Sequence, residues 1–383
     1  MSLRNGLVVA QVAMSLVLLV AAGLFLRTFV SLSQSPIGMN TDRLLAVEID
    51  MRETAGTNEV RQQLLDRMRE IVAAQPGVSS TAASAVTLLS GRGWNTGIGD
   101  VFPPPRNRMS WVNAVTPGWF DTVGARIIEG RDFAENDGDD VVVVNETFAR
   151  TYLEPGPAVG QTIQLVGPGG PEPALRVIGL TTDVMYRSPR DGMVPTLFLP
   201  PSRGLTTSLV VRYAPGQQAE VGRGLQTALR QIDPDVSFVV RPFDELARAT
   251  TARERITAAL AVAFGLLALV LAAVGLYGVM AYSVGRRRGE IAVRLALGAG
   301  RPTIWRLVVG RGSALVALGV AAGALVSWWA AQYVQTLLFG LDARDPGTLV
   351  VGASVLAAVG LAAAWIPAWR ASQIDPAGLL RDS

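Results

Sequence analysis

The side chains that most often carry out catalysis or bind metals are missing from this sequence. Its 383 residues include no cysteine and no histidine, and all 34 basic residues are arginine. The usual zinc sites and disulfides need cysteine or histidine, and serine or cysteine nucleophiles are normally activated by histidine. A phosphate-binding P-loop needs a lysine. The sequence therefore predicts no histidine-based active site and no ATP hydrolysis by this chain alone.

Carboxylates are the remaining candidates for chemistry. The densest acidic run is ENDGDD at Glu135–Asp140. Such runs can bind cations, but this one lacks the ligand spacing of an EF-hand, which favours a solvated turn. Spacing alone singles out no pair of carboxylates for glycosidase-type chemistry. We therefore predict no catalytic residues, no metal site and no cofactor.

The densest positive charge lies in Ser283–Gly312, which holds seven arginines and one acid. That acid, Glu290, precedes Arg294 by four residues, an order that stabilises a helix by about 0.3 kcal/mol. Apolar residues lie between the charges, and Gly298, Ala299 and Gly300 follow as a helix breaker. The residues alone support two interpretations equally. The segment either docks on a partner protein or lies on the membrane with its arginines on anionic lipid.

Four charge-free runs each exceed the roughly 18–20 apolar residues that cross a bilayer as a helix. They are Asn5–Leu26, Ile256–Gly285, Gly312–Leu341 and Pro346–Trp369. Because core helices of soluble proteins rarely lack charge over such lengths, we predict four transmembrane helices. A cleaved signal peptide ending near Val20–Ala22 is the alternative for the first run. The apolar pattern continues through Val30, which favours an uncleaved helix.

The distribution of charge predicts the topology. Residues 31–255 hold 22 arginines and 26 acids, whereas the rest of the chain holds 12 arginines and five acids. Short arginine-rich loops stay in the cytoplasm, so the basic segment and both termini are predicted to be cytoplasmic and residues 31–255 extracytoplasmic. Trp328, Trp329 and Tyr333 mark the outer end of the third run, as interfacial aromatics do. Gly319 and Gly323 form a small-xxx-small pair that another helix can approach.

Residues 31–255 have the pattern of a mixed α/β domain with two β-α-β units. The first unit begins at Leu44 and its second strand follows Val78, and the second begins at Ser208 and ends in the strand SFVVRPF. Together they suggest a split ferredoxin-like layer. A strand-rich module at about 112–200 separates them, and Asn145 is placed to cap a short helix. Phe243–Arg255 has no glycine or proline. We therefore predict that it extends the second transmembrane helix as one rod.

These features together resemble the MacB/FtsX family of ABC transporter permeases, over essentially the whole chain. The segment GRRRGEIAVRLALGAGRPTIWRLV is similar to the family's R-x-x-E-I-x-x-R-x-A-x-G-A element. Its matching residues are Glu290, Ile291, Arg294, Ala296, Gly298 and Ala299. The ending PAWRASQIDPAGLLR is similar to the family's closing motif, and VTPGWFDTVGARIIEGRDF resembles its periplasmic core. The start of the chain resembles the second half of duplicated orphan permeases.

The resemblance implies a fold and a domain arrangement. The expected fold is an α-helical membrane protein with four transmembrane helices and a large MacB-like α/β domain inserted between helices 1 and 2. The expected domains are helix 1 at 1–30, the extracytoplasmic core at 31–255, and an FtsX-like permease domain at 256–383. The last three helices are expected at about 256–284, 313–338 and 348–369.

The resemblance also implies the function. It predicts a permease subunit in the bacterial plasma membrane that couples ATP hydrolysis by a separate cytoplasmic ATPase to movement of its extracytoplasmic domain, for export or extrusion of a substrate. The family's coupling helix maps to Glu290, Ile291, Arg294, Leu295, Gly298 and Ala299. A second permease unit, as a homodimer or duplicated half, is the other expected partner, and no nucleic acid is expected. The alternatives are an FtsX-like regulator of a cell-wall enzyme and a membrane-anchored extracytoplasmic enzyme.

Overall fold

The computed structural model describes residues 3–50, 57–99, 108–167, 169–204, 207–232, 236–286 and 301–372. The chain divides into two compact units. The membrane unit consists of residues 1–32 and 253–383, and the α/β domain of residues 33–252. Each unit is described separately below.

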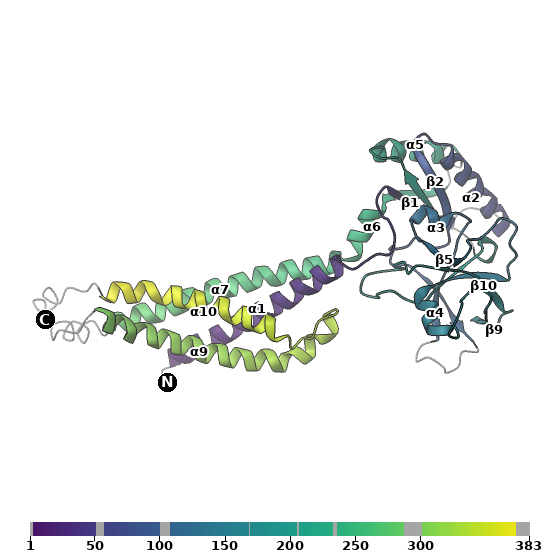
Figure 1. The fold of residues 1–383 in the computed structure, drawn as a ribbon. Helices are drawn as coiled ribbons and strands as arrows, with labels where there is room; N and C mark the ends of the chain where they lie inside the picture. Colours follow the sequence, from purple (N-terminus) through teal and green to yellow (C-terminus); the bar gives the residue numbers. More distant parts are fainter. Residues whose placement is uncertain are drawn as a thin grey trace, which may run out of the picture. The chain divides into compact units, whose positions relative to one another are not determined.

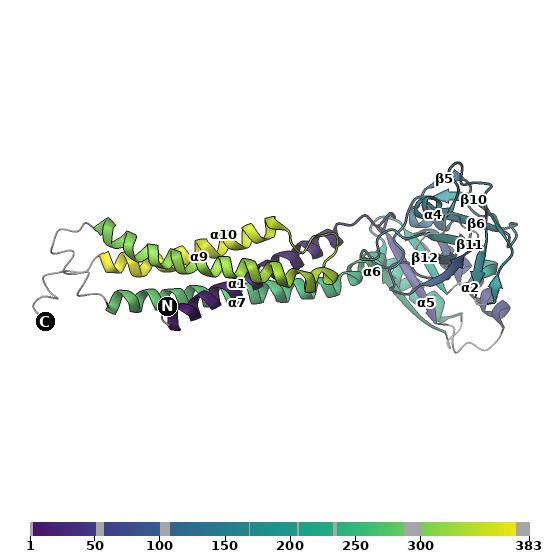
Figure 2. The same cartoon turned by 90° about the horizontal axis from the view of Figure 1, so that it is seen from below.

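Four long helices make up the described part of the membrane unit (Figures 1 and 2). They are α1 (Leu3–Ser33), α7 (Ala252–Arg286), α9 (Arg301–Val334) and α10 (Pro346–Ser372). Each contains a stretch long and apolar enough to cross a membrane: Asn5–Ser33, Ala252–Arg286, Gly312–Leu337 and Pro346–Arg370. A short 3-10 helix, η2 (Gln335–Leu337), follows α9. The four apolar runs of the sequence thus form four candidate membrane spans.

Helix α1 is the most enclosed of the four. In its apolar stretch 44% of the residues are buried, compared with 22–28% in the other three helices. Its buried stripe repeats every four residues, which is one face of a helix. The stripe consists of Val8, Val12, Leu16, Val20 and Leu24. Residues of α7, α9 and α10 join it in one hydrophobic cluster, so α1 packs against each of the other three helices.

The two predicted β-α-β units form one layer of the α/β domain. The first unit is β1 (Leu44–Asp50), α2 (Asn58–Ala73) and β2 (Val78–Ser84). The second is β12 (Ser208–Tyr213), α5 (Gln218–Arg230) and β13 (Ser237–Pro242). All pairings are antiparallel, and the strand order is β13-β1-β12-β2. This is the ferredoxin-like order, which confirms the prediction from spacing.

Each face of this sheet packs against different partners because side chains alternate along a strand. Leu45 and Val47 of β1 face α2 and α5, where they meet Leu65, Met68 and Leu225. Leu44 and Ala46 face the opposite way and join a cluster that contains α3 (Trp119–Val123) and α6 (Phe243–Thr250). The sheet is therefore buried on both sides.

The second layer is a mixed nine-stranded sheet. Its path is β5-β10-β6-β11-β4-β3-β8-β9, with β7 paired to β10. The strands are β3 (Trp94–Ile98), β4 (Met109–Ala114), β5 (Ile127–Gly130), β6 (Val141–Asn145), β7 (Thr162–Ile163), β8 (Leu165–Gly167), β9 (Gly170–Pro171), β10 (Leu175–Thr181) and β11 (Thr196–Leu199). The first strand of this sheet begins at Trp94, before the predicted start of the strand-rich module at about residue 112.

Asn145 ends the central strand β6 and caps α4 (Glu146–Tyr152), as predicted. Its side-chain oxygen accepts from the backbone N–H of Phe148 at 2.9 Å and of Thr196 at 2.9 Å, and its amide donates to the carbonyl of Val194 at 2.9 Å. Asn145 is fully buried. These bonds satisfy a buried amide and fix where β6 gives way to α4.

The connection from α1 into the α/β domain is docked on that domain by backbone hydrogen bonds. The N–H of Met185 donates to the carbonyl of Ile37 at 2.8 Å, and the N–H of Asn40 donates to the carbonyl of Val123 at 3.1 Å. The guanidinium of Arg212 donates to the carbonyls of Asn40, Asp42 and Thr122 at 2.9–3.1 Å. This connection, residues 34–43, therefore belongs mechanically to the domain.

The second connection differs from the prediction of one continuous rod, which is wrong. Helix α6 ends at Thr250, Thr251 leaves helical geometry with φ −110° and ψ 10°, and α7 begins at Ala252. The hydroxyl of Thr250 donates to the carbonyl of Ala247 at 2.6 Å, and that of Thr251 to the carbonyl of Arg248 at 3.3 Å. Such bonds let threonine side chains compete with a regular helix. A one-residue joint thus separates α6 from α7.

The acidic run ENDGDD is anchored by an ion pair between Arg131 and Asp137. Arg131 forms a two-pronged ion pair with Asp137, each N–O distance being 2.7 Å, and the N–H of Ala134 donates to Asp137 at 2.8 Å. The hydrogen bond from Arg131 lowers the pKa of Asp137 to about 2. Because an unfolded aspartate titrates near pKa ~3.9, the carboxylate stabilises the folded domain above about pH 4. That contribution is lost as the pH falls towards 2.

Asp137→Asn is therefore expected to destabilise the α/β domain in a pH-dependent way. The free energy of unfolding should fall by about 1 kcal/mol at pH 7, because Arg131 is half exposed and solvent-exposed ion pairs contribute little more than this. The cost should shrink between pH 4 and pH 2. Urea unfolding of residues 33–252 at pH 7, 4 and 2.5 measures it, with Glu135→Gln in the same turn as the control. A cost that does not change with pH would contradict the role given to Arg131.

Candidate coupling site in the membrane helices

The predicted coupling residues lie outside the described part of the chain. Glu290, Ile291, Arg294, Leu295, Gly298 and Ala299 all fall between residues 287 and 300. The described helices on either side are α7, which ends at Arg286, and α9, which begins at Arg301. The way in which these two helices are held determines how any movement of the segment reaches the rest of the molecule.

Helix α1 is hydrogen-bonded to α7 within the apolar stretch. The side-chain amide of Gln11 donates to the carbonyl of Leu271 at 2.7 Å, and the hydroxyl of Ser15 donates to that of Ala268 at 3.0 Å. Gly275 leaves room for the Gln11 side chain, because any Cβ there would collide with it. Polar contacts between helices in a membrane contribute about 1 kcal/mol each. They fix the position of α1 along α7.

Helix α9 packs on α1 through glycine. A Cβ at Gly319 would lie 2.5 Å from a methyl carbon of Val12, and one at Gly323 would lie 2.8 Å from the carbonyl oxygen of Ala13. Only a residue without a side chain allows such an approach. The predicted contact face at Gly319 and Gly323 is confirmed, and its partner is α1.

Gly323→Ala is expected to lower the thermal stability of the membrane unit. The added methyl group would force α9 away from α1, at a cost of about 1–3 kcal/mol for an overpacked contact. Gly310→Ala, on the same helix with nothing within 4 Å of a new Cβ, should be neutral or slightly stabilising. Thermal unfolding of both variants in detergent measures the difference. Equal stability of the two variants would show that the close approach is unimportant.

The two ends of the bundle carry polar contacts as well. At the end near Ser33, Arg27 of α1 pairs with Asp345, which caps α10 by accepting from the N–H of Thr348 at 2.7 Å. The Thr348 hydroxyl and N–H hold the pKa of Asp345 below its usual value, and the charge of Arg27 adds to this effect. At the other end, Arg370 of α10 donates to the hydroxyl of Tyr277 on α7 at 3.1 Å.

Comparison with known proteins identifies both units. A family model described as the MacB-like periplasmic core domain matches residues 6–259, and one described as the FtsX-like permease C-terminal domain matches residues 262–376. The chain belongs to the MacB/FtsX family of ABC transporter permeases. The first match includes α1, although α1 packs in the membrane unit with the helices of the second match.

Several relatives of this permease are known by sequence or structure. The macrolide export ATP-binding/permease protein MacB 1/2 of Paracoccus denitrificans is 26% identical, over 70% of this chain and 42% of that protein. The uncharacterized ABC transporter permease YknZ of Bacillus subtilis is 23% identical, over 70% of this chain and 69% of that protein. The periplasmic region of MacB from Actinobacillus actinomycetemcomitans aligns with a TM-score of 0.38 at 18% identity, covering 55% of this chain and 92% of that one.

The permease chain spans less than half the length of several MacB relatives that it matches. The polar residues that join its helices were not predicted from the sequence, because Gln11 and Ser15 carry no charge and lie within a run identified only by its lack of charge. Gln11 is an amide side chain within the first run, and the order Asp345-Pro346 is a common helix start. The sequence shows both of these features, but it does not show which residues Gln11 and Asp345 contact.

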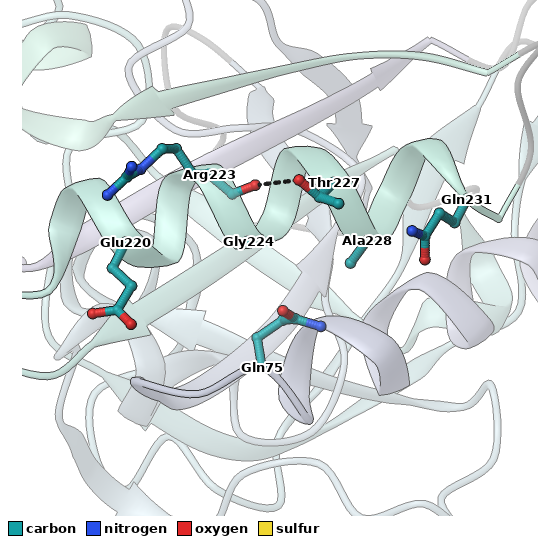
Figure 3. A pocket seen from close by; sticks show the side chains of 7 residues that line it. All are labelled: Gln75, Glu220, Arg223, Gly224, Thr227, Ala228 and Gln231. Atoms are coloured by element: carbon teal, nitrogen blue, oxygen red, sulfur yellow. Dashed lines mark hydrogen bonds between the residues drawn. The ribbon is translucent and has the colours of Figure 1, made fainter.

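The α/β domain of the permease also carries a groove of about 440 Å³ along α5 (Figure 3). Gly224 and Ala228 of α5 face Gln75, which follows the end of α2. The remaining lining residues are Glu220, Arg223, Thr227 and Gln231. Small-molecule sites are usually mostly apolar and enclosed. This groove is an open depression between α5 and the segment after α2, so it lacks the enclosure of such sites.

Proposed function

We propose that this chain is the permease subunit of an ABC transporter, in which a separate cytoplasmic ATPase drives movement of the α/β domain to export a substrate. In this proposal residues 31–255 form the extracytoplasmic domain and residues 256–383 the permease domain, and both ends of the chain are cytoplasmic in the bacterial plasma membrane. A second permease unit, either a homodimer partner or a duplicated half, completes the transporter.

The observation that carries the proposal is the pairing of α1 with α7. Both helices connect directly to the α/β domain, α1 through residues 34–43 and α7 through Thr251. At its other end, helix α7 leads into residues 287–300 of the basic segment. Because Gln11 and Ser15 bind α7, a push on the basic segment would move α7 and α1 together. Rigid elements with two positions are the physical requirement for coupling distant sites.

The test uses the absence of native cysteine. Single-cysteine variants at Glu135 and Ser383 can be labelled in intact cells with a membrane-impermeant maleimide. We expect Glu135→Cys to react from outside and Ser383→Cys only after lysis. The intact protein, purified from its native host, should bring down an ATPase with a P-loop. Labelling of Ser383→Cys from outside would overturn the topology, and recovery of a cell-wall hydrolase with the ATPase would favour the regulator instead.

A further inference from the structure

The end of α9 that leads to residues 338–345 exposes a cluster of aromatic residues. Trp328, Trp329 and Tyr333 are 55%, 62% and 65% exposed, and Trp329 and Tyr333 meet edge to face at 5.2 Å. Leu325 lies four residues before Trp329 and is 74% exposed. Leu325, Trp329 and Tyr333 therefore line one face of the helix over about 12 Å. That length spans the interface and the first part of an acyl chain.

A single arginine is positioned beside this face. The guanidinium of Arg344 lies 5.0 Å from the ring centroid of Trp328, a cation–π geometry that restrains it. Within the described part of the chain it has no carboxylate partner. The nearest acid in sequence, Asp345, is already bound by Arg27 and Thr348. The guanidinium donors of Arg344 are thus available to an external anion.

An exposed carboxylate accompanies this arginine. Asp342 accepts the backbone N–H of Arg344 through Oδ1 at 2.9 Å, which holds the two residues in one turn. Its other oxygen remains for a second donor. The turn therefore presents one positive and one negative group two residues apart, and Arg344 lies against Trp328 beside the apolar face. A purely anionic headgroup would meet the Asp342 carboxylate, whereas a headgroup with a phosphate and an ammonium matches both charges.

We propose that this surface binds one phospholipid with a primary-ammonium headgroup of the phosphatidylethanolamine type. The phosphate accepts hydrogen bonds from Arg344, the ammonium donates to Asp342, and one acyl chain lies along Tyr333, Trp329 and Leu325. Phosphatidylcholine lacks ammonium hydrogens and forfeits the Asp342 contact. Phosphatidylglycerol lacks the positive charge. The inference requires only that this end of α9 lies at a membrane interface, and the proposed topology assigns it to the outer leaflet.

Native mass spectrometry of the intact purified protein, offered each of the three lipids at equal concentration, tests the site. Wild type should retain phosphatidylethanolamine above the other two. Arg344→Ala should reduce its retention by roughly fivefold, the loss expected of one charge-assisted contact. Asp342→Asn should remove the preference for phosphatidylethanolamine over phosphatidylglycerol. Arg255→Ala, an exposed arginine at the start of α7, is the matched control and should retain lipid as wild type does.

Several outcomes would overturn the proposal. Equal retention of the three lipids by wild type would show that the surface is an aromatic belt without headgroup specificity. Equal losses in Arg344→Ala and Arg255→Ala would show general charge attraction rather than a site. A dimer that dissociates only in Arg344→Ala would make the surface a contact between two copies of the chain. Circular dichroism and gel filtration of each variant separate these results from misfolding.

Discussion

Arg294→Glu is expected to reduce the amount of ATPase that co-purifies with this permease by roughly tenfold or more, because reversing one interfacial charge commonly costs over 1.4 kcal/mol. Arg294 belongs to the segment that resembles the family's coupling helix, and it follows Glu290 by four residues. The substitution removes a positive charge from the proposed docking segment and places a second negative charge four residues after Glu290. Quantitative blotting of the ATPase after solubilisation in mild detergent measures the loss.

The control must separate docking from simple attraction of arginines to anionic lipid. Arg306→Glu makes the same change in charge at an exposed position of α9, within the basic segment but outside the six predicted coupling residues. It should leave the ATPase bound. Arg294→Lys keeps the charge and should retain most of the association. If Arg306→Glu releases as much ATPase as Arg294→Glu, the segment acts through its overall charge and the docking interpretation is wrong.

The membrane helices and the first sheet could be predicted from sequence because single physical constraints dominate them. A helix that crosses a bilayer needs about 20 apolar residues and satisfies its backbone hydrogen bonds internally. Charge-free runs of that length therefore indicate the membrane-spanning helices directly. The ferredoxin-like layer follows from two β-α-β units whose helices, α2 and α5, each bury one stripe. Val221, Leu225 and Leu229 of α5 are almost completely buried, as the spacing of apolar residues indicates.

The break at Thr251 and the contacts of Gln11 could not be predicted in the same way. A run without glycine or proline predicts one continuous helix, yet α6 ends where Thr250 and Thr251 bond back to the carbonyls of Ala247 and Arg248. Gln11 is one polar residue in an apolar run, and only the structure pairs it with Leu271. The six coupling residues lie outside the described residues, so their role stays a prediction from resemblance.

The two connections to the α/β domain differ in how they can transmit movement. Residues 34–43 are docked on the domain by Arg212 and by backbone bonds. The other connection consists of Thr251 alone, which is buried between α6 and α7. A joint of one ordered residue permits a change of direction but little change of distance. Displacement of α7 along its axis would therefore reach α6, and through Phe243 the core of the domain.

Insertion of Gly-Gly-Ser-Gly between Thr251 and Ala252 is accordingly expected to remove most of the proposed ATP-dependent movement of the domain, while binding of the proposed ATPase is kept. Four flexible residues add up to about 13 Å of slack with no preferred direction. Because the chain has no native cysteine, dyes at Glu135→Cys and Leu341→Cys report the movement by energy transfer in nanodiscs with the ATPase. The same insertion after Gly169, in the β8–β9 turn, is the control and should leave the signal intact. An unchanged signal with the insertion at Thr251 would assign transmission to α1 and its docked connection, since only that path remains.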